Sequence, residues 1–261
     1  MNPGPAPGSC VPSTGMTTES ELQTDVPHAA RIWNYWMGGT DNFPADRAAG
    51  DAVVRVYPEI AVMARESRRF LTRVVRYLAE EAGIRQFLDI GTGLPTMQNT
   101  HEVAPAARVV YVDNDPLVLA HARRLGTGSY IHADYHEPER ILAEAELDFS
   151  QPVAVMFMGV LGYEPDLDVV RSIVSRTLAG TAPGSHLVLW DGTNTTPAVV
   201  EGAKRLAESG GVPYILRGPD ELASCFDGLP LIEPGLVPIT RWRAEGDFID
   251  AYGAVGRSLG A

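Results

Sequence analysis

The stretch "QFLDIGTGLPTMQNT", residues 86–100, decides the fold of this chain. Its first five residues form a short apolar run typical of a buried strand, and the glycine pair Gly91 and Gly93 follows directly. A glycine turn after a strand is typical of a nucleotide-like ligand site, but Thr96 stands where the dinucleotide pattern G-x-G-x-x-G needs its third glycine. Because Asp89 lies just before the turn, the motif predicts a ligand that suits a carboxylate.

The length and composition are those of an ordinary globular protein. The 261 residues fit one large domain, or one domain with an appendage, and no apolar run approaches the roughly 20 residues of a membrane helix. Residues 1–25 are rich in Pro, Gly, Ser and Thr and lack the features of a secretory signal, so we expect a disordered tail. Cys10 lies in this tail and Cys225 far from it, which favours a reducing cytoplasm over a disulfide framework.

The formal net charge is −12, with 33 acidic and 21 basic residues. A nucleic-acid-binding protein normally carries a basic face that displaces counterions from the phosphate backbone. The charge therefore argues against a nucleic acid and favours a small-molecule partner. The histidines are scattered and the sequence shows no cluster of metal ligands, so we expect no metal site. The sequence gives no indication of the oligomeric state.

Strand-like and helix-like segments alternate through the middle of the chain. A helical period of apolar residues runs over 59–82, and Gly83 can end the helix. The segments expected after it are strands at 86–90, 107–115, 129–135, 152–158 and 186–192, with helices at 116–125 and 167–178. Continuous apolar strands separated by helices predict a parallel sheet covered on both faces, with its ligands at the carboxyl ends of the strands.

The C-terminal part departs from this alternation. Residues 198–208 and 218–226 are expected to form helices. The segments 229–242 and 247–256 read as two strands that lie close together in the sequence. Their short connection predicts an antiparallel pair at an edge of the sheet.

The N-terminal part also stands outside the alternation. The segment "RIWNYWMGGTDNFPADR", residues 31–47, concentrates too much aromatic surface to be left in water. Gly38 and Gly39 would permit a sharp bend or a close approach of the backbone to a ligand. We therefore divide the ordered chain into a lid segment, residues 26–58, and a main domain, residues 59–261.

Three carboxylates decide between the cofactors that such a sheet can bind. Asp89, Asp113 and Asp134 each end a predicted parallel strand, so they should gather at one rim of the sheet. Three acids would repel a pyrophosphate, whereas S-adenosylmethionine has no phosphate and carries a sulfonium, an ammonium, a ribose diol and an adenine amino group. A single Asp at such a place is more often a helix cap or a turn residue, and a nicotinamide dinucleotide stays as the alternative cofactor. Taken together, the acids favour S-adenosylmethionine.

The segment "FLDIGTGLPTMQNTHEVAPAARVVYVDNDPLVLAHARRL", residues 87–125, resembles the actinobacterial S-adenosylmethionine-dependent methyltransferase family formerly classed as the domain of unknown function DUF574. Residues 31–47 are similar to the N-terminal signature of that family, and "FDGLPLIEPGLVPITRW", residues 226–242, to its C-terminal one. The resemblance covers about residues 28–256. It implies a class I, Rossmann-like α/β fold: a seven-stranded, mostly parallel sheet with its last strand antiparallel and helices on both faces, together with the N-terminal helical lid.

The resemblance also implies a set of cofactor contacts. They are, for the methionine end, Asp89, Gly91, Thr92 and Gly93; for the ribose, Asp113 and Asn114; for the adenine, Asp134 and Tyr135; for the reacting methyl group, Met158 and Gly159; and from the lid, Tyr35, Gly39 and Asn42. As an alternative, Tyr35 and Trp36 are equally well explained as core aromatics of the lid segment.

The sequence departs from the family pattern near the expected substrate pocket. Family members often carry a His-aromatic pair where this chain has Gly162 and Tyr163, and often a His where it has Asp191. A general base is needed only if the methyl acceptor must lose a proton. On location alone, the candidate catalytic residues are Tyr163, Asp191 and His136.

The resemblance implies a methyltransferase. The charge favours a small-molecule acceptor, which the sequence does not identify, and the cysteines favour a cytoplasmic location. Methyl transfer from a sulfonium needs little covalent help, because placing a nucleophile in line at about 3 Å supplies much of the rate. Two alternatives stay open at this point. The protein could bind S-adenosylmethionine and catalyse a non-methylating rearrangement, or it could have only a binding role.

Overall fold

The computed structural model describes residues 23–95, 98–125 and 129–260, and its centre is a seven-stranded sheet with the strand order β3-β2-β1-β4-β5-β7-β6. The strands are β1 (Gln86–Ile90), β2 (Arg108–Asp113), β3 (Ser129–His132), β4 (Ala154–Met158), β5 (His186–Gly192), β6 (Val237–Pro238) and β7 (Ala251–Arg257). The tail predicted to be disordered, residues 1–25, lies outside the described residues apart from 23–25.

The sheet has the predicted topology. Strands β1 to β5 are parallel, β7 is antiparallel to β5, and β6 is antiparallel to β7. The chain order reverses at β1, which lies between β2 and β4. Ligands of open α/β sheets bind at such a switch point. The class I methyltransferase fold expected from the sequence is thus confirmed.

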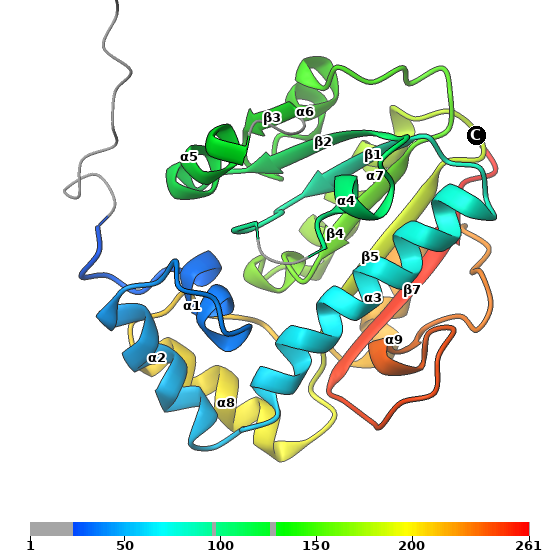
Figure 1. The fold of residues 1–261 in the computed structure, drawn as a ribbon. Coiled ribbons are helices and arrows are strands. Elements are labelled where there is room, and N and C mark those ends of the chain that lie inside the picture. Colours follow the sequence, from blue (N-terminus) through cyan, green and yellow to red (C-terminus); the bar gives the residue numbers. More distant parts are fainter. Residues whose placement is uncertain (1–22, 96–97, 126–128, 261) are drawn as a thin grey trace, which may run out of the picture.

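Helices cover both faces of the sheet, and Figure 1 shows α3 crossing the front face while α1, α2 and α8 gather beside one end of it. The helices are α1 (Ala29–Trp36), α2 (Pro44–Val54), α3 (Ile60–Glu80), α4 (Thr100–Val103), α5 (Pro116–Leu125), α6 (Pro138–Glu144), α7 (Leu167–Ala179), α8 (Pro197–Glu208) and α9 (Pro219–Ala223), with 3-10 turns η1 (Leu161–Tyr163), η2 (Ser224–Phe226) and η3 (Ile239–Arg241). In the described part of the chain, no helix combines the length and the apolar character needed to cross a membrane.

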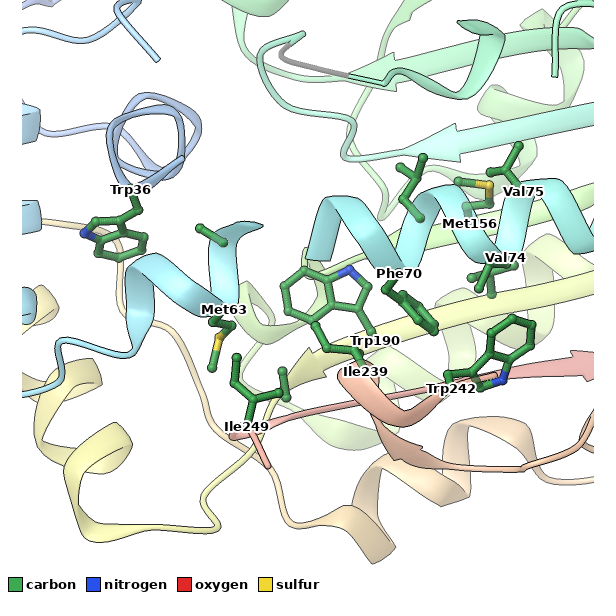
Figure 2. Close-up of a cluster of buried hydrophobic side chains, with 14 of the residues drawn as sticks. Trp36, Met63, Phe70, Val74, Val75, Met156, Trp190, Ile239, Trp242 and Ile249 are labelled. Atoms are coloured by element: carbon green, nitrogen blue, oxygen red, sulfur yellow. The ribbon is translucent and has the colours of Figure 1, made fainter. Parts of the chain in front are cut away.

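Alternation along the strands builds a separate core on each face. In β1, Phe87 packs with α3, whereas Leu88 and Ile90 pack on the opposite face with α6 and α7. Figure 2 shows the α3 side, where Phe70 and Trp190 lie among buried side chains from α3, β5 and the C-terminal segment. Because side chains of a strand alternate between faces, Asp89 shares the α3 side with Phe87.

The N-terminal segment is anchored by a buried ion pair. The Arg31 guanidinium on α1 lies 2.9 Å from a carboxylate oxygen of Asp46 on α2, and both side chains are almost fully buried. Asp46 also accepts hydrogen bonds from the backbone N–H groups of His28 and Phe43. Close helix packing continues to α8, where a side chain at Gly202 would meet Tyr57. The segment is therefore attached to the main domain through α8.

The C-terminal edge strand is shorter than the sequence suggested. Only Val237 and Pro238 of the expected strand 229–242 form β6, although Leu231 makes an isolated antiparallel bridge with Gly256. Proline has no N–H group to donate to a strand ladder, and Pro230, Pro234 and Pro238 interrupt this stretch.

Candidate active site

One cavity of about 400 Å³ opens where the carboxyl ends of the strands meet the N-terminal segment. The loops after β1, β2, β3 and β4 form one side of it, and α1, α2, α3 and α8 form the other. We call these the strand-end wall and the helical wall.

The glycine turn after β1 is held by the protein's own hydrogen bonds. Gly91 and Gly93 have φ angles of +73° and +67°, which side chains other than glycine rarely adopt. The N–H groups of Gly91 and Thr92 donate to the Val112 carbonyl, and the N–H of Gly93 donates to Asp113 Oδ2. A pyrophosphate site would need such N–H groups free to point at the ligand. At these three positions they are already used.

Asp89 lines the cavity and has one buried carboxylate oxygen without a hydrogen-bond partner in the described part of the chain. Its Oδ2 accepts a hydrogen bond from the Thr100 hydroxyl at 3.0 Å, whereas its buried Oδ1 has no hydrogen-bond partner among the described residues. Burial raises the pKa of Asp89 to about 6, although Thr100 and the charge of Arg68 oppose this shift. A buried acceptor without a partner is costly. A ligand cation with N–H donors would satisfy this oxygen and favour its ionised form.

Asp113 links the turn after β1 to the loop after β2. Its Oδ2 accepts from Gly93 N–H at 2.8 Å and its Oδ1 from Asp115 N–H at 2.9 Å. Burial raises its pKa, and these two hydrogen bonds oppose the rise. The carboxylate lines the cavity in a fixed orientation with lone pairs left to accept ligand hydroxyls.

A chain of hydrogen bonds fixes the rim after β3. Asp134 Oδ2 accepts from the Asn114 amide at 3.1 Å, and Asp134 Oδ1 lies 2.6 Å from His136 Nδ1. His136 Nε2 lies 2.7 Å from a carboxylate oxygen of Glu164. Burial lowers the pKa of His136, but its bonds to the two carboxylates outweigh burial and raise it overall. Asn114, Asp134 and Tyr135 line the cavity, and His136 braces them from outside its lining.

The end of β4 touches aromatic rings from distant parts of the chain. Gly159 has a φ of +78°, and a side chain there would lie 2.6 Å from the Trp190 ring. The Trp33 ring lies 5.8 Å from that of Trp190, and the Tyr163 ring meets that of Tyr214 edge-on at 4.9 Å. All these residues line the cavity.

Asp191 at the end of β5 lies behind Tyr214. The Tyr214 hydroxyl donates a short hydrogen bond to Asp191 Oδ1, which also accepts from Gly162 N–H at 3.3 Å. A side chain at Gly162 would lie 2.2 Å from the Tyr214 ring, so the glycine makes room for it. Burial raises the pKa of Asp191 to about 7, against the effects of Tyr214 and the nearby Arg217 charge.

The structure brings most of the predicted contacts together. The cavity is lined by Asp89, Gly91, Thr92, Gly93, Asp113, Asn114, Asp134, Tyr135, Met158 and Gly159, and by the candidate base Tyr163. Asp191 and His136 are each one hydrogen bond behind a lining residue.

The three predicted lid contacts lie apart from this lining. Tyr35 donates to Asp51 at 2.6 Å, and Asn42 donates to Asn34 and to the Gly39 carbonyl at 2.9 Å. Contact of these side chains with a cofactor stays a prediction. These hydrogen bonds hold α1 in place, and Trp33 and Trp36 of α1 do line the cavity.

Sequence reasoning missed several polar residues of the cavity, among them Arg68 and Tyr214. Arg68 lines it near Asp89 and donates to Asn99 Oδ1 at 3.2 Å. A helical period that includes the buried Ala64 and Leu71 places Arg68 on the same inward face, so this signal could have found it. Tyr214 lies in a segment without periodic structure, and no local pattern marks it.

The donors and acceptors at the strand ends fit S-adenosylmethionine better than a dinucleotide. The unsatisfied Asp89 oxygen suits an ammonium, and Asp113 suits a diol. The N–H groups of residues 91–93 are committed inside the protein. The geometry thus supports S-adenosylmethionine, the cofactor that the three acids favoured in the sequence analysis.

Comparison with known proteins identifies the family. The family model described as S-adenosyl methyltransferase matches residues 15–257. The chain belongs to this S-adenosyl methyltransferase family, whose cofactor is S-adenosylmethionine. The family resemblance expected from residues 31–47, 87–125 and 226–242 is confirmed.

Two solved structures share most of the chain. A candidate methyltransferase from Thermobifida fusca is 39% identical with a TM-score of 0.85, and the match covers 92% of this chain and 97% of that one. A DUF574 family protein from Streptomyces avermitilis is also 39% identical, with a TM-score of 0.86 and coverage of 91% and 99%. Among curated proteins the chain has no match.

A more distant similarity concerns the fold alone. An S-adenosylmethionine-dependent methyltransferase from Archaeoglobus fulgidus is 14% identical with a TM-score of 0.51, covering 73% of this chain and 94% of that chain. This distant protein therefore shares the fold of this chain and supports no statement about its substrate.

Proposed function

We propose that this protein transfers the methyl group of S-adenosylmethionine to a small-molecule acceptor bound in the same cavity. The observation that carries the proposal is Asp89 at the end of β1, which lines the cavity and has a buried carboxylate oxygen without a hydrogen-bond partner among the described residues. Together with Asp113 and Asp134 it gives the strand-end wall an acidic lining suited to a cationic, phosphate-free cofactor.

The cofactor would lie along the strand-end wall. Asp89 and the turn from Gly91 to Gly93 would hold its methionine end, and Arg68 would face the carboxylate there. Asp113 and Asn114 would bind the ribose hydroxyls. Asp134 and Tyr135 would lie against the adenine, with Asp134 held in place by Asn114 and His136.

When bound, the cofactor supplies an activated methyl group on a sulfonium leaving group. Met158 and Gly159 would place this end of the cofactor against the helical wall. The protein's own contribution is to orient the acceptor in line with the methyl group and to exclude water. The acidic surface favours a small molecule over a nucleic acid, and the fold does not identify which one.

We further propose that the lid segment, residues 26–58, closes over the cofactor. Its contacts reach the loop after β2, because His28 Nδ1 lies 3.0 Å from Asp115 Oδ2. They also reach α5, since His121 Nε2 lies 3.8 Å from Asp41 Oδ1. Hydrogen exchange of residues 31–47 should slow when S-adenosylhomocysteine is added. Equal exchange in both states would instead indicate a static part of the domain.

A calorimetric comparison tests the cofactor. Purified protein should bind S-adenosylmethionine and S-adenosylhomocysteine and should not bind NAD. Preferential binding of NAD would overturn the assignment.

The alternatives differ in their products. Formation of S-adenosylhomocysteine with a cell extract supports methyl transfer, conversion of a substrate without it supports a non-methylating rearrangement, and cofactor binding with neither product leaves only a binding role.

A further inference from the structure

The helical wall of the cavity is aromatic where it meets the strand ends. Trp33 of α1 lies edge-on to Trp36 at 5.6 Å and packs against Trp190 of β5 at 5.8 Å, with 31° between the latter pair of rings. Tyr163 and Tyr214 form a second aromatic pair at the same strand ends. Broad ring faces of this kind favour a flat aromatic ligand over a flexible polar one.

The charged side chains of the lining belong to the cofactor side. The acids among them are Asp89, Asp113 and Asp134, which end strands β1 and β2 or follow β3. The basic groups lie close to acids of the strand ends, since His28 is beside Asp115 and the charge of Arg68 on α3 lowers the pKa of Asp89. Apart from Arg68 on α3, the described lining residues of the helical wall offer an acceptor mainly apolar surface and a few hydroxyl or indole groups.

The Tyr214 hydroxyl is the polar group placed nearest the end of β4. It lies 3.4 Å from the Gly159 carbonyl oxygen and 3.4 Å from the Gly192 nitrogen. Its proton is directed at Asp191 and its oxygen accepts the long hydrogen bond from the Gly192 N–H, which leaves one lone pair to accept a hydrogen bond from a ligand. Asp191 itself is 2% exposed and reaches the cavity only through this hydroxyl.

Building on the proposed function, we infer that the methyl acceptor is a planar aromatic compound with a phenolic hydroxyl, and that Tyr214 passes the acceptor's proton to Asp191. The acceptor ring would lie against Trp33 and Trp190, and its hydroxyl would donate to Tyr214. Asp191 thereby becomes the base at a position where the family pattern often has a histidine, and Tyr214 connects it to the cavity.

The step balances in atoms and charge. The acceptor oxygen forms a bond to the methyl carbon while the carbon–sulfur bond breaks, and that electron pair stays on sulfur. The acceptor's hydroxyl proton moves to the Tyr214 oxygen, and the Tyr214 proton moves to Asp191 Oδ1. The positive charge of the sulfonium and the negative charge of the carboxylate disappear together, so no net charge is created in the buried site. Asp191 returns its proton to water after the product leaves.

The surroundings of Asp191 suit a base that works near neutral pH. Burial raises its pKa to about 7, and the opposing groups are the Tyr214 hydroxyl, the Arg217 guanidinium and the Gly162 N–H. The other titratable groups that interact with it are Tyr135, Tyr163 and Cys225, each of whose pKa values is raised by burial and by Asp191. Arg217 donates to the carbonyls of Leu161 and Glu164 and so is held in place beside the pair.

The other candidate bases are less well placed for this role. His136 makes hydrogen bonds to carboxylates through both ring nitrogens, with Asp134 on one side and Glu164 on the other. Tyr163 lines the cavity, but burial and the Asp191 charge raise the pKa of its hydroxyl, so it would not ionise near neutral pH. A neutral Tyr214 that hands a proton onward avoids this difficulty.

Binding of model compounds tests the acceptor class. Equilibrium dialysis in the presence of S-adenosylhomocysteine would compare 2-naphthol, 7-hydroxycoumarin, 2-methoxynaphthalene and cyclohexanol. We expect both hydroxyarenes to bind at least 10-fold more tightly than cyclohexanol, and 2-naphthol more tightly than its methyl ether. Trp33→Leu should weaken the hydroxyarenes about 10-fold, whereas Phe248→Leu, at an exposed ring outside the cavity lining, should not. Equal binding of all four compounds would overturn the assignment.

Two variants test the proton path. Tyr214→Phe should bind 2-naphthol and 2-methoxynaphthalene equally and should methylate 2-naphthol at least 100-fold more slowly. The turnover of the unaltered protein should rise with pH through about 7, because Asp191 must be ionised, and Asp191→Asn should lose this rise. The matched variant Tyr252→Phe, in β7 and outside the cavity lining, should behave like the unaltered protein.

The outcomes separate this inference from the function on which it rests. Calorimetry with S-adenosylhomocysteine is run on every variant, and Tyr214→Phe should keep the parent affinity within about 2-fold. Cofactor binding without hydroxyarene preference, or a Tyr214→Phe variant that keeps the hydroxyl preference and the pH profile, would overturn the inference alone. Loss of cofactor binding in the unaltered protein would overturn the proposed function as well.

Discussion

The strand-end wall and the helical wall of the cavity are built from different kinds of sequence information. Asp89, Gly91 and Gly93 belong to one short motif, and Asp113 ends the next strand. The aromatic side of the cavity, where the helical wall meets the strand ends, instead contains Trp33, Trp190 and Tyr214. These residues come from three parts of the chain that meet only after folding. The comparison teaches that a cofactor site can be local in sequence while the site for the second substrate is not.

Replacing Asp113 should give the largest loss of cofactor affinity. An unchanged affinity would contradict the assignment of the cofactor to the strand-end wall. Asp113→Ala removes a charged acceptor from the ribose position, and losing such hydrogen bonds costs about 1.5–3 kcal/mol, or roughly 10- to 150-fold in affinity for S-adenosylmethionine. Because Asp113 also anchors Gly93, thermal unfolding must be measured beside calorimetry. A folded variant with unchanged affinity would place the ribose elsewhere.

A larger side chain at Gly162 tests whether the acceptor side of the cavity can be disturbed without disturbing the cofactor side. A methyl group there would meet the Tyr214 ring at 2.2 Å, so Gly162→Ala should cost about 1–3 kcal/mol of unfolding free energy by overpacking. It should also displace Tyr214 from Asp191 and slow methyl transfer, while affinity for the cofactor stays within about 2-fold. Gly228→Ala is the comparison, since nothing lies within 4 Å of its added methyl and any effect there comes from its φ of +78° alone. Equal turnover in Gly162→Ala and the parent would separate Tyr214 from catalysis.

Asp89→Asn should stabilise the empty protein while weakening the cofactor. The folded pKa of Asp89 is raised to about 6 and its unfolded value is near 4, so ionisation destabilises the fold progressively as pH rises from about 4 to 6. Above pH 7 this cost is of the order of 3 kcal/mol, and the amide should recover a part of it. Urea unfolding at pH 8 should show the gain, which should shrink as pH falls toward 4. A variant that is less stable at pH 8 would contradict this account of the carboxylate.

The same substitution should weaken S-adenosylmethionine about 10-fold, because the ammonium loses its charged partner. In the unaltered protein, affinity should fall as pH drops below about 6 and Asp89 takes up a proton. Calorimetry at pH 5 and pH 8 measures both effects. An affinity independent of pH over this range would remove Asp89 from the cofactor site.

The smallest expected effect concerns the segment that carries Trp33. Asn42→Ala removes the hydrogen bonds to Asn34 and Gly39 that brace the end of α1. We expect the free energy of unfolding to fall by about 1 kcal/mol and the affinity for the cofactor to fall 2- to 5-fold. The effect is small because α1 becomes less firmly held while every residue of the cavity lining stays in place. Direct contact of Asn42 with the cofactor would give a larger loss of affinity, so the magnitude distinguishes bracing from binding.

Much of the fold could be predicted because its signals are local. The apolar runs of β1, β2, β4 and β5 are fully buried or nearly so, as their continuity indicated. The strand predicted over 229–242 shrank to two residues because its prolines cannot donate to the ladder. Arg68 could have been found from its place on the inward face of α3. Its closeness to Asp89 could not, because that depends on how α3 crosses the sheet.

The sequence by itself determined the first strand with its glycine turn, the acids at the strand ends and the cofactor that these acids favour. Each of these depends on residues a few positions apart. Only the tertiary structure decided that Gly162 makes room for Tyr214 and that Tyr214 connects the cavity to Asp191. The physical reason is that burial and contact between distant segments set both the space and the pKa of these groups. A hydrogen bond between a loop tyrosine and a strand-end carboxylate leaves no periodic trace in the chain.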